Sequence, residues 1–154
     1  MDIAIIMGSA SDEQVMREAV PYLEYFGLSF EIKISSAHRQ PDETAEYAKG
    51  LAARGVNVVI AGAGMAAHLP GVVAAFTTLP VIGVPLSGSE MNGVDALYSI
   101  VQMPAGVPVA TVAIGKAGAR NAAVLAAQII GLGNPAVAAK LVAFKQNLCK
   151  LPGA

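Results

Sequence analysis

The segment Gly8-Ser9-Ala10-Ser11-Asp12 places a glycine, two hydroxyls and a carboxylate between an apolar run and a helical pattern. A glycine lets backbone N–H groups approach an anion, and the start of a helix adds partial positive charge. Ser9 and Ser11 can donate hydroxyl protons to phosphate oxygens, whereas the Asp12 carboxylate suits sugar hydroxyls better. The alternative is a plain turn in which Ser11 or Asp12 caps the helix.

A second polar segment, Ser35-Ser36-Ala37-His38-Arg39-Gln40-Pro41, also follows an apolar run and precedes a helical pattern. The guanidinium of Arg39 offers a planar fork of donors for phosphate. His38 titrates at about pH 6.5 when unperturbed, which suits proton transfer at neutral pH. Ser36 and Ala37 complete the loop. The alternative is a solvated histidine beside an arginine that pairs with an acidic neighbour.

A third loop, Ala61–Gly71, contains mainly small residues. Gly64, Ala66 and Ala67 leave room for a ligand ring or for a close subunit contact. His68 borders an apolar helix, where a histidine is more often packed and hydrogen-bonded than catalytic.

Other common ligand signatures are weak in this sequence. Two histidines and a single cysteine are too few for a zinc site, so no metal is expected. The segment Gly115-Lys116-Ala117 lacks the spacing and the hydroxyl of a P-loop, and Gly62-Ala63-Gly64 lacks the third glycine of a dinucleotide fingerprint.

Alternating β-rich runs and helical patterns determine where these loops lie. The predicted strands are Ile3–Met7, Phe30–Ser35, Asn57–Ala63, Val81–Leu86 and Pro108–Ile114. The predicted helices are Asp12–Phe26, Pro41–Arg54, Ala67–Thr77, Gly93–Met103, Gly118–Ile130 and a C-terminal helix, Pro135–Lys150. Such alternation predicts a three-layer α/β/α fold with a doubly wound, five-stranded parallel sheet, in which the three loops share one edge.

Two segments have special features. Pro21 falls inside the first predicted helix, where it removes a backbone hydrogen bond, so we expect a kink there. The segment Ser87–Gly93 is rich in small polar residues and glycine, which suits a lid or an ordered loop over the pocket.

The composition suggests buried surface between subunits. The chain has 154 residues, enough for one domain, with 55% hydrophobic and only 14% charged residues. This charged fraction is low for a monomer, and it favours a homo-oligomer over an Ala- and Gly-rich monomer.

Charge and apolar patterning exclude several partners. The net charge is −1 and the basic residues are scattered, so we expect no nucleic-acid binding. No apolar run approaches the about 20 residues needed to cross a bilayer, and the N-terminus lacks a signal-peptide pattern. We therefore expect no membrane association. Because Cys149 is the lone cysteine, no internal disulfide can form, and a reducing cytoplasmic setting is expected.

Four ordered motifs together resemble the PurE family. They are Met7-Gly8-Ser9 with Ser11-Asp12, Ser36-Ala37-His38-Arg39, the Ala61–Gly71 loop, and Ser99-Ile100-Val101-Gln102-Met103-Pro104. The resemblance is closest to its class I members, the N5-carboxyaminoimidazole ribonucleotide mutases of purine biosynthesis. It covers Ile3 to about Ile130 and implies a single domain over residues 1–154, a flavodoxin-like fold and a homo-octamer.

The resemblance implies an isomerase that moves a carboxyl group from nitrogen to a ring carbon of a phosphoribosyl substrate, without ATP, metal, biotin or another cofactor. His38 falls at the general acid and base position. The phosphate positions are Ser9 and Arg39, with Ser11 beside them, and Asp12 falls where the ribose is held. The base and carbon dioxide end is lined by Ala66, Ala67, His68 and Leu69. Gly8, Ser36, Ala37 and Gly64 complete the expected substrate-binding set.

Three residues depart from the family pattern. Glu13 stands where Trp is usual, Met65 where Gly is usual, and Gln40 where Thr is usual. Met65 matters most, because a positive φ at that position would strain any residue except glycine. We expect Glu13 and Gln40 to face solvent or a neighbour, and activity to survive all three changes.

Two alternative functions stay open at this point. One is the class II reaction, in which free carbon dioxide carboxylates aminoimidazole ribonucleotide. The Ala66–Gly71 sequence and Arg39 argue against it, since class II members lack that loop form and usually carry Lys after the loop histidine. The other is a non-catalytic nucleotide- or flavin-binding module, which the absence of Trp and the four Tyr make less favourable.

Overall fold

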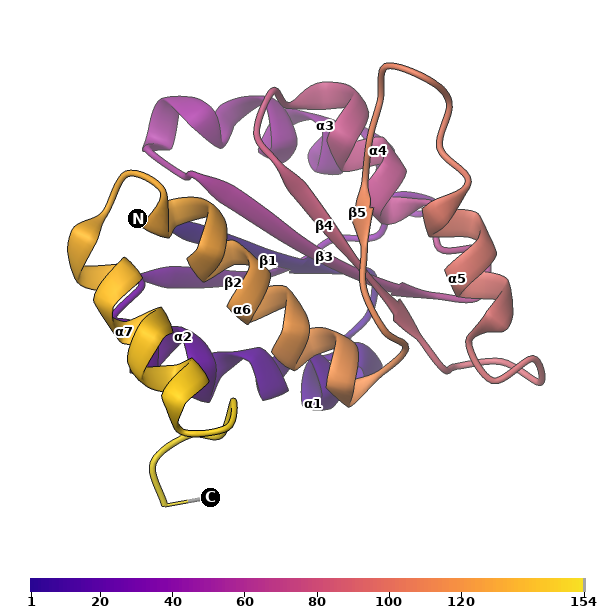
Figure 1. Cartoon of the computed structure of the whole chain (residues 1–154). Coiled ribbons are helices and arrows are strands. Elements are labelled where there is room, and N and C mark those ends of the chain that lie inside the picture. The colour runs from indigo at the N-terminus through magenta and orange to yellow at the C-terminus, as the bar shows by residue number, and fades with distance from the viewer. Residues whose placement is uncertain (154) are drawn as a thin grey trace.

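Five parallel strands lie in the order β2-β1-β3-β4-β5 in the computed structural model, which describes residues 1–153 (Figure 1). Their bounds are β1 Ile3–Met7, β2 Phe30–Ile34, β3 Val58–Gly64, β4 Val81–Leu86 and β5 Ala110–Thr111. The order confirms the predicted doubly wound sheet. Winding reverses between β1 and β3, which is where α/β folds of this kind open a crevice beyond the strand ends.

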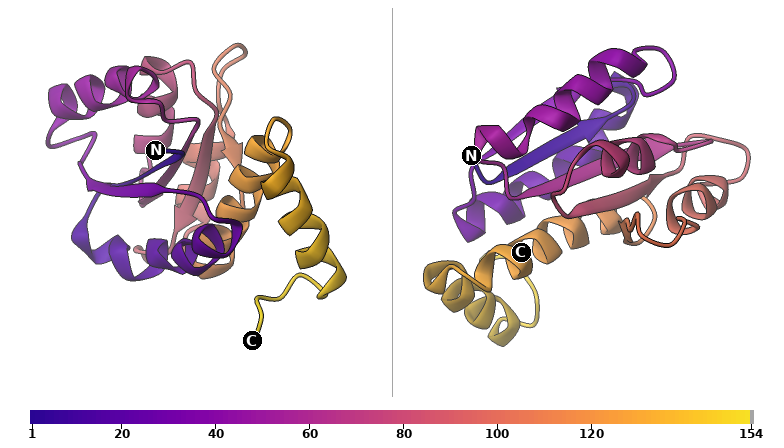
Figure 2. Two further views of the ribbon diagram at one scale, coloured as in Figure 1. Left: turned by 90° about the vertical axis from the view of Figure 1, so that its left-hand side faces the viewer. Right: turned by 90° about the horizontal axis from the view of Figure 1, so that it is seen from above.

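Helices cover both faces of the sheet (Figure 2). The helices are α1 Glu13–Met16, α2 Val20–Phe26, α3 Pro41–Gly50, α4 Leu69–Phe76, α5 Val94–Val101, α6 Lys116–Gly131 and α7 Pro135–Gln146, with 3-10 turns at Ala10–Asp12, Arg17–Ala19 and Ala52–Arg54. One layer contains α1, α2, α6 and α7, and the other contains α3, α4 and α5. None of the helices within residues 1–153 is long and apolar enough to cross a membrane.

The central strand β1 supplies both hydrophobic cores. Ile3, Ile5 and Met7 face the layer that contains α6, while Ala4 and Ile6 face the layer that contains α4. All five are fully buried, as expected for a strand covered on both faces. Helix α6 approaches the sheet closely because its buried side is made of Ala119, Ala122, Ala123, Ala126 and Ala127.

The helix predicted over Asp12–Phe26 is not continuous, so that prediction is wrong in detail. A 3-10 turn over Arg17–Ala19 separates α1 from α2, which confirms the interruption expected from Pro21. Pro21 lies in the first turn of α2, where a missing N–H leaves no intrahelical bond unmade.

The last strand is shorter than the predicted Pro108–Ile114. Val112 N–H still donates to the Gly83 carbonyl at 3.1 Å, but the neighbouring strand then presents Pro85, which has no N–H to donate. The ladder therefore ends after Thr111. At the C-terminus, α7 stops at Gln146 rather than Lys150, because Leu148 and Cys149 adopt positive φ.

Candidate active site

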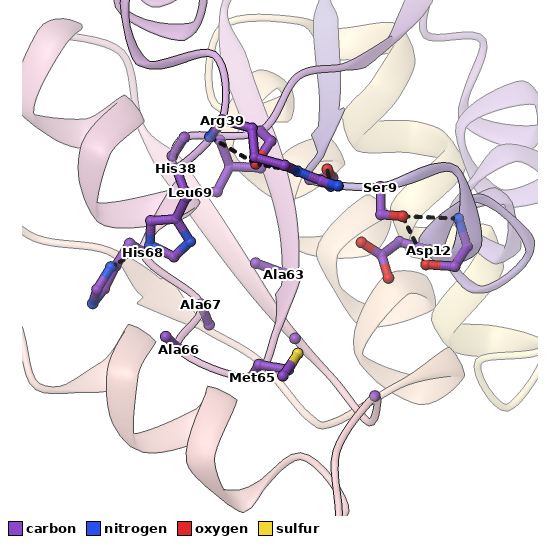
Figure 3. Close-up of a pocket in the computed structure, with 16 residues that line it drawn as sticks. Ser9, Asp12, His38, Arg39, Ala63, Met65, Ala66, Ala67, His68 and Leu69 are labelled. Atoms are coloured by element: carbon purple, nitrogen blue, oxygen red, sulfur yellow. Dashed lines mark hydrogen bonds between the residues drawn. The ribbon is translucent and has the colours of Figure 1, made fainter.

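The loops that follow β1, β2 and β3 converge on a cavity of about 510 Å³ (Figure 3). This volume is in the range of small-molecule sites. The cavity is lined by Gly8, Ser9, Ser11, Asp12, Ser36, Ala37, His38, Arg39, Ala63, Gly64, Met65, Ala66, Ala67, His68, Leu69 and Gly88. The structure thus brings together every residue of the predicted site, and their contacts with a ligand stay predictions.

Three lining residues, Ala63, Met65 and Gly88, lie outside the predicted substrate-binding set. The sequence analysis singles out Met65 only as a departure from the family pattern. Ala63 lies in β3 and was interpreted as strand core, although its position near the strand end is a usable signal. Gly88 lies in the 87–93 segment, which was interpreted as a lid, and it is the part of that segment that lines the cavity.

Ser9 organises the loop after β1. Its Oγ accepts a hydrogen bond from Ser11 N–H at 3.3 Å and another from the Ser11 hydroxyl at 2.9 Å. Neither Ser11 nor Asp12 caps the helix with its side chain, so that alternative is wrong: Ser9 has the extended backbone of an N-cap and caps the 3-10 turn instead. Because Ser9 Oγ accepts both bonds, its own proton is free to donate to a ligand.

Gly8 and Arg39 form the adjoining wall. A Cβ at Gly8 would meet nothing within 4 Å, so the glycine leaves open space on the cavity side. Arg39 donates to the Gly8 carbonyl from Nη2 and to Ser36 Oγ from Nε, both at the long distance of 3.4 Å. These weak bonds orient the guanidinium and leave most of its donors available to an anion.

Asp12 is a half-buried carboxylate across the pocket from the histidines (Figure 3). Removal from water raises the pKa of Asp12 above its ordinary value, and hydrogen bonding from Ser9 and Ser11 only partly offsets this effect. A carboxylate that is poorly solvated gains from accepting sugar hydroxyls.

His38 and His68 contact each other directly, although they come from different loops. Nε2 of His38 lies 2.6 Å from Nδ1 of His68, and the rings meet edge to face (Figure 3). Both side chains are exposed to the pocket opening. His68 is hydrogen-bonded as expected, but its partner is the other histidine and its ring is not packed in the core.

The loop after β3 holds two residues in left-handed backbone. Met65 has φ 54° and Ala67 has φ 37°, so the positive φ considered for Met65 is confirmed. Ala67 N–H donates to the Gly64 carbonyl at 3.0 Å, which closes the turn. The helix predicted from Ala67 therefore begins at Leu69, with His68 as its N-cap residue.

The other two departures from the family pattern lie outside the cavity lining. Glu13 is partly buried and pairs with Arg17, and Gln40 is exposed and donates to Glu43 Oε2 at 2.7 Å. Within residues 1–153, no group of three or more His, Cys, Asp or Glu side chains is placed to hold a metal ion.

Comparisons with known proteins agree on one family. The family described as AIR carboxylase matches residues 2–150. The N5-carboxyaminoimidazole ribonucleotide mutase of Vibrio cholerae is 56% identical over 145 residues, covering 94% of this chain and 90% of its own. The protein of the same name from Thermotoga maritima is 57% identical over 146 residues, covering 95% and 84%.

A solved structure supports the same relationship. The chain superposes on the crystal structure of PurE from Treponema denticola with a TM-score of 0.86 and 29% identity, covering 96% of this chain and 90% of that one.

Proposed function

The chain belongs to the AIR carboxylase family, and on this premise we propose that it is an N5-carboxyaminoimidazole ribonucleotide mutase whose proton-transfer residue is His38. It is an isomerase of purine biosynthesis: it moves the carboxyl group from the exocyclic N5 to C4 of the imidazole. Eight curated relatives with this name match at 53–57% identity over at least 92% of the chain. The observation that supports the proposed site most directly is the convergence of three strand-end loops on one cavity.

The phosphate of the substrate binds between the loops after β1 and β2. Ser9 donates its free hydroxyl proton, with Ser11 beside it, and Arg39 supplies guanidinium donors and positive charge. The open space at Gly8 lets phosphate oxygens approach the backbone.

The ribose and the imidazole extend from this point along the cavity. Asp12 accepts hydrogen bonds from the ribose hydroxyls, which replace the water that burial has removed. Ser36, Ala37 and Gly64 also line the cavity. At the far end Ala66, Ala67, His68 and Leu69 surround the imidazole and leave room for a carbon dioxide molecule.

The chemistry then needs two proton transfers, and His38 carries out both. Protonated His38 donates to N5 as the N–C bond breaks and carbon dioxide leaves. C4 attacks the enclosed carbon dioxide to form the C–C bond, and His38 removes the C4 proton. Protons and electrons balance over the whole cycle, so the reaction itself calls for no oxidant or reductant.

The substrate is thus a small phosphoribosyl compound, and the enzyme works as a homo-octamer in the cytoplasm. Assembly is supported by the 14% charged fraction and by exposed apolar side chains on α5, Val94, Tyr98 and Val101. These recur at i, i+4 and i+7, on one side of the helix.

The test is an ATP-free assay that starts from 4-carboxy-5-aminoimidazole ribonucleotide, with and without labelled bicarbonate. We expect the N5-carboxylated isomer to form with little label incorporation, because carbon dioxide stays enclosed. Rapid label exchange with release of free aminoimidazole ribonucleotide would instead establish the class II reaction. Absence of any conversion would refute the enzyme and favour a binding module.

A further inference from the structure

His68 contacts the proposed general acid and base directly, but the proposed reaction sequence gives it no part in proton transfer. Its Nδ1 lies 2.6 Å from Nε2 of His38, with ring centroids 4.7 Å apart and an interplanar angle of 86°. At this distance one nitrogen must carry a proton and donate it, and the other must accept. The ring of His68 is therefore placed to act on His38 directly.

Backbone hydrogen bonds position the two loop residues that carry these rings. His38 lies in a tight turn closed by the bond from Gln40 N–H to the Ser36 carbonyl at 2.7 Å. His68 follows the left-handed Ala67, and its own carbonyl accepts the Val72 N–H of α4 at 2.9 Å. Both positions are thus fixed although both rings are exposed.

We propose that His68 is a positioning residue for His38: its Nδ1 accepts the Nε2–H of His38, which leaves Nδ1 of His38 to exchange protons with the substrate. This proposal rests on the proposed function, in which His38 alternates between its neutral and protonated forms. It assigns to His68 the tautomer with its proton on Nε2.

Only this direction of the bond is compatible with both forms of His38. When His38 carries both ring protons, a proton on Nδ1 of His68 would face the Nε2–H at hydrogen-bond distance and repel it. A neutral His68 that accepts at Nδ1 keeps the bond throughout. Because the two nitrogens of an imidazole point to nearly opposite sides, Nδ1 of His38 faces away from His68, toward the side of the pocket where Ala63 lies (Figure 3).

An acceptor at Nδ1 of His68 is useful because His38 carries a positive charge in one of its two forms. The other charged side chains that line the pocket are Arg39 and Asp12. The lone pair of His68 stabilises the charged form of His38. Loss of the acceptor should therefore make His38 a weaker base, and protonation of His68 in acid should have the same effect.

Two variants separate the hydrogen bond from the ring contact. His68→Asn can place an acceptor oxygen near the position of Nδ1, whereas His68→Phe keeps an aromatic ring against His38 without an acceptor. We expect His68→Phe to lower kcat by about 10-fold to 100-fold, part of what general acid–base catalysis supplies, with KM changed little. His68→Asn should recover most of the loss. Equal kcat in the two variants would overturn the proposal.

A second measurement does not depend on turnover. The chain has only two histidines, so the ring ¹⁵N signals of the ligand-free protein can be assigned with His68→Phe, which retains His38 alone. We expect the proton of neutral His38 to lie on Nε2 in the parent protein, and the His38 titration to move to lower pH in His68→Phe.

An unchanged tautomer and titration of His38 in His68→Phe would overturn the proposal whatever the enzyme activity. A parent protein that fails to convert the ribonucleotide would instead refute the proposed function and leave the ¹⁵N result to decide the pairing of the two histidines.

Discussion

The polar side chains around the cavity keep hydrogen-bonding groups free for a ligand. Ser9 accepts two bonds and retains its own proton, and Arg39 makes only two long bonds within the protein. Because these side chains border the cavity and do not pack in the hydrophobic core, they contribute little to the stability of the fold. Changes at single pocket residues should therefore affect activity more than folding.

His38→Asn should remove turnover while leaving the fold intact. An exposed loop side chain contributes proton transfer and little packing, so we expect kcat to fall by at least about 100-fold, with the circular dichroism spectrum unchanged. The matched control is Asp42→Asn, an exposed change just beyond the same loop and outside the cavity lining. Near-normal turnover of His38→Asn, or its unfolding, would contradict the assigned role.

Asp12→Asn should stabilise the ligand-free protein at neutral pH and weaken substrate binding. Burial raises the pKa of Asp12 in the folded state, so the ionised form lowers the free energy of unfolding at pH values above that raised pKa. This cost disappears as the pH falls toward the unfolded-state value of 3.8. Urea unfolding of both proteins should therefore show a stability difference that narrows in acid, and a constant difference would argue against the pKa effect.

Met65→Gly should leave activity within a few-fold of the parent protein. Glycine relieves a left-handed strain of about 1 kcal/mol but adds a similar amount of unfolded-state entropy, so the free energy of unfolding should change by less than about 1 kcal/mol. Met65→Ala, which removes the long side chain and keeps the strain, is the control. A large rise in turnover in Met65→Gly alone would show that Met65 impairs the enzyme.

At this scale the sequence predicted which residues meet, but not how they bond. Residue types and strand-end positions identified Ser9, His38 and Arg39, whereas Leu69 and a binding role for His68 came only from the family resemblance. The cap made by Ser9 and the pairing of His38 with His68 depend on rotamers and loop torsions, which no local pattern contains. The left-handed φ of Met65 was anticipated only through the family resemblance.

Helices and strands determine how precisely the loops are presented. The loops of the site follow β1, β2 and β3. The sheet that carries these strands is supported on one face by α6, whose alanines let it pack close to the strands. At Gly118 a Cβ would clash with the carbonyl of Ala113, in the loop that leads into α6, and would also crowd Val84 of β4.

Gly118→Ala should destabilise the protein strongly. The clashing atoms belong to the backbone and cannot rotate away, so α6 must shift, at a cost of about 1–3 kcal/mol or more. Gly50→Ala in α3 is the matched control: its Cβ would meet nothing within 4 Å, and it should stabilise by up to about 1 kcal/mol. Denaturant unfolding would measure both, and equal effects would contradict the packing at Gly118.

Element positions were more predictable than element lengths. Periodicity located each strand and each later helix, because buried strands and helices have distinct apolar patterns. The break in Asp12–Phe26 was expected from Pro21, which lies in the same segment. The shortening of β5 was not, because Pro85 lies in β4 and removes a hydrogen-bond donor from the strand beside it. The apolar periodicity of a strand contains no information about a proline in the strand that pairs with it.

At the scale of the whole molecule, the apolar side of α5 is the surface that we propose for self-association. Val94, Tyr98 and Val101 are between 39% and 62% exposed, which is costly in water for side chains of this kind. Because only 14% of the residues are charged, little charge repulsion opposes contact between this surface and a second copy of the chain.

The proposed octamer predicts a mass of about eight chains in light scattering, and Tyr98→Glu should lower that mass. A charge placed in an apolar contact is left unpaired when subunits associate, which weakens the assembly. A monomeric parent protein at micromolar concentration would refute the octamer, and an unchanged mass for Tyr98→Glu would remove α5 from the interface.

The order of these parts along the chain affects how the enzyme is made. Every residue of the cavity lies between Gly8 and Gly88, whereas α6, which packs beneath β3, β4 and the Arg17–Ala19 turn, begins at Lys116. During translation the loops that line the cavity therefore leave the ribosome before the helix that supports the sheet. A nascent chain that ends before Lys116 thus contains every residue of the proposed site but lacks the helix that packs against β3 and β4.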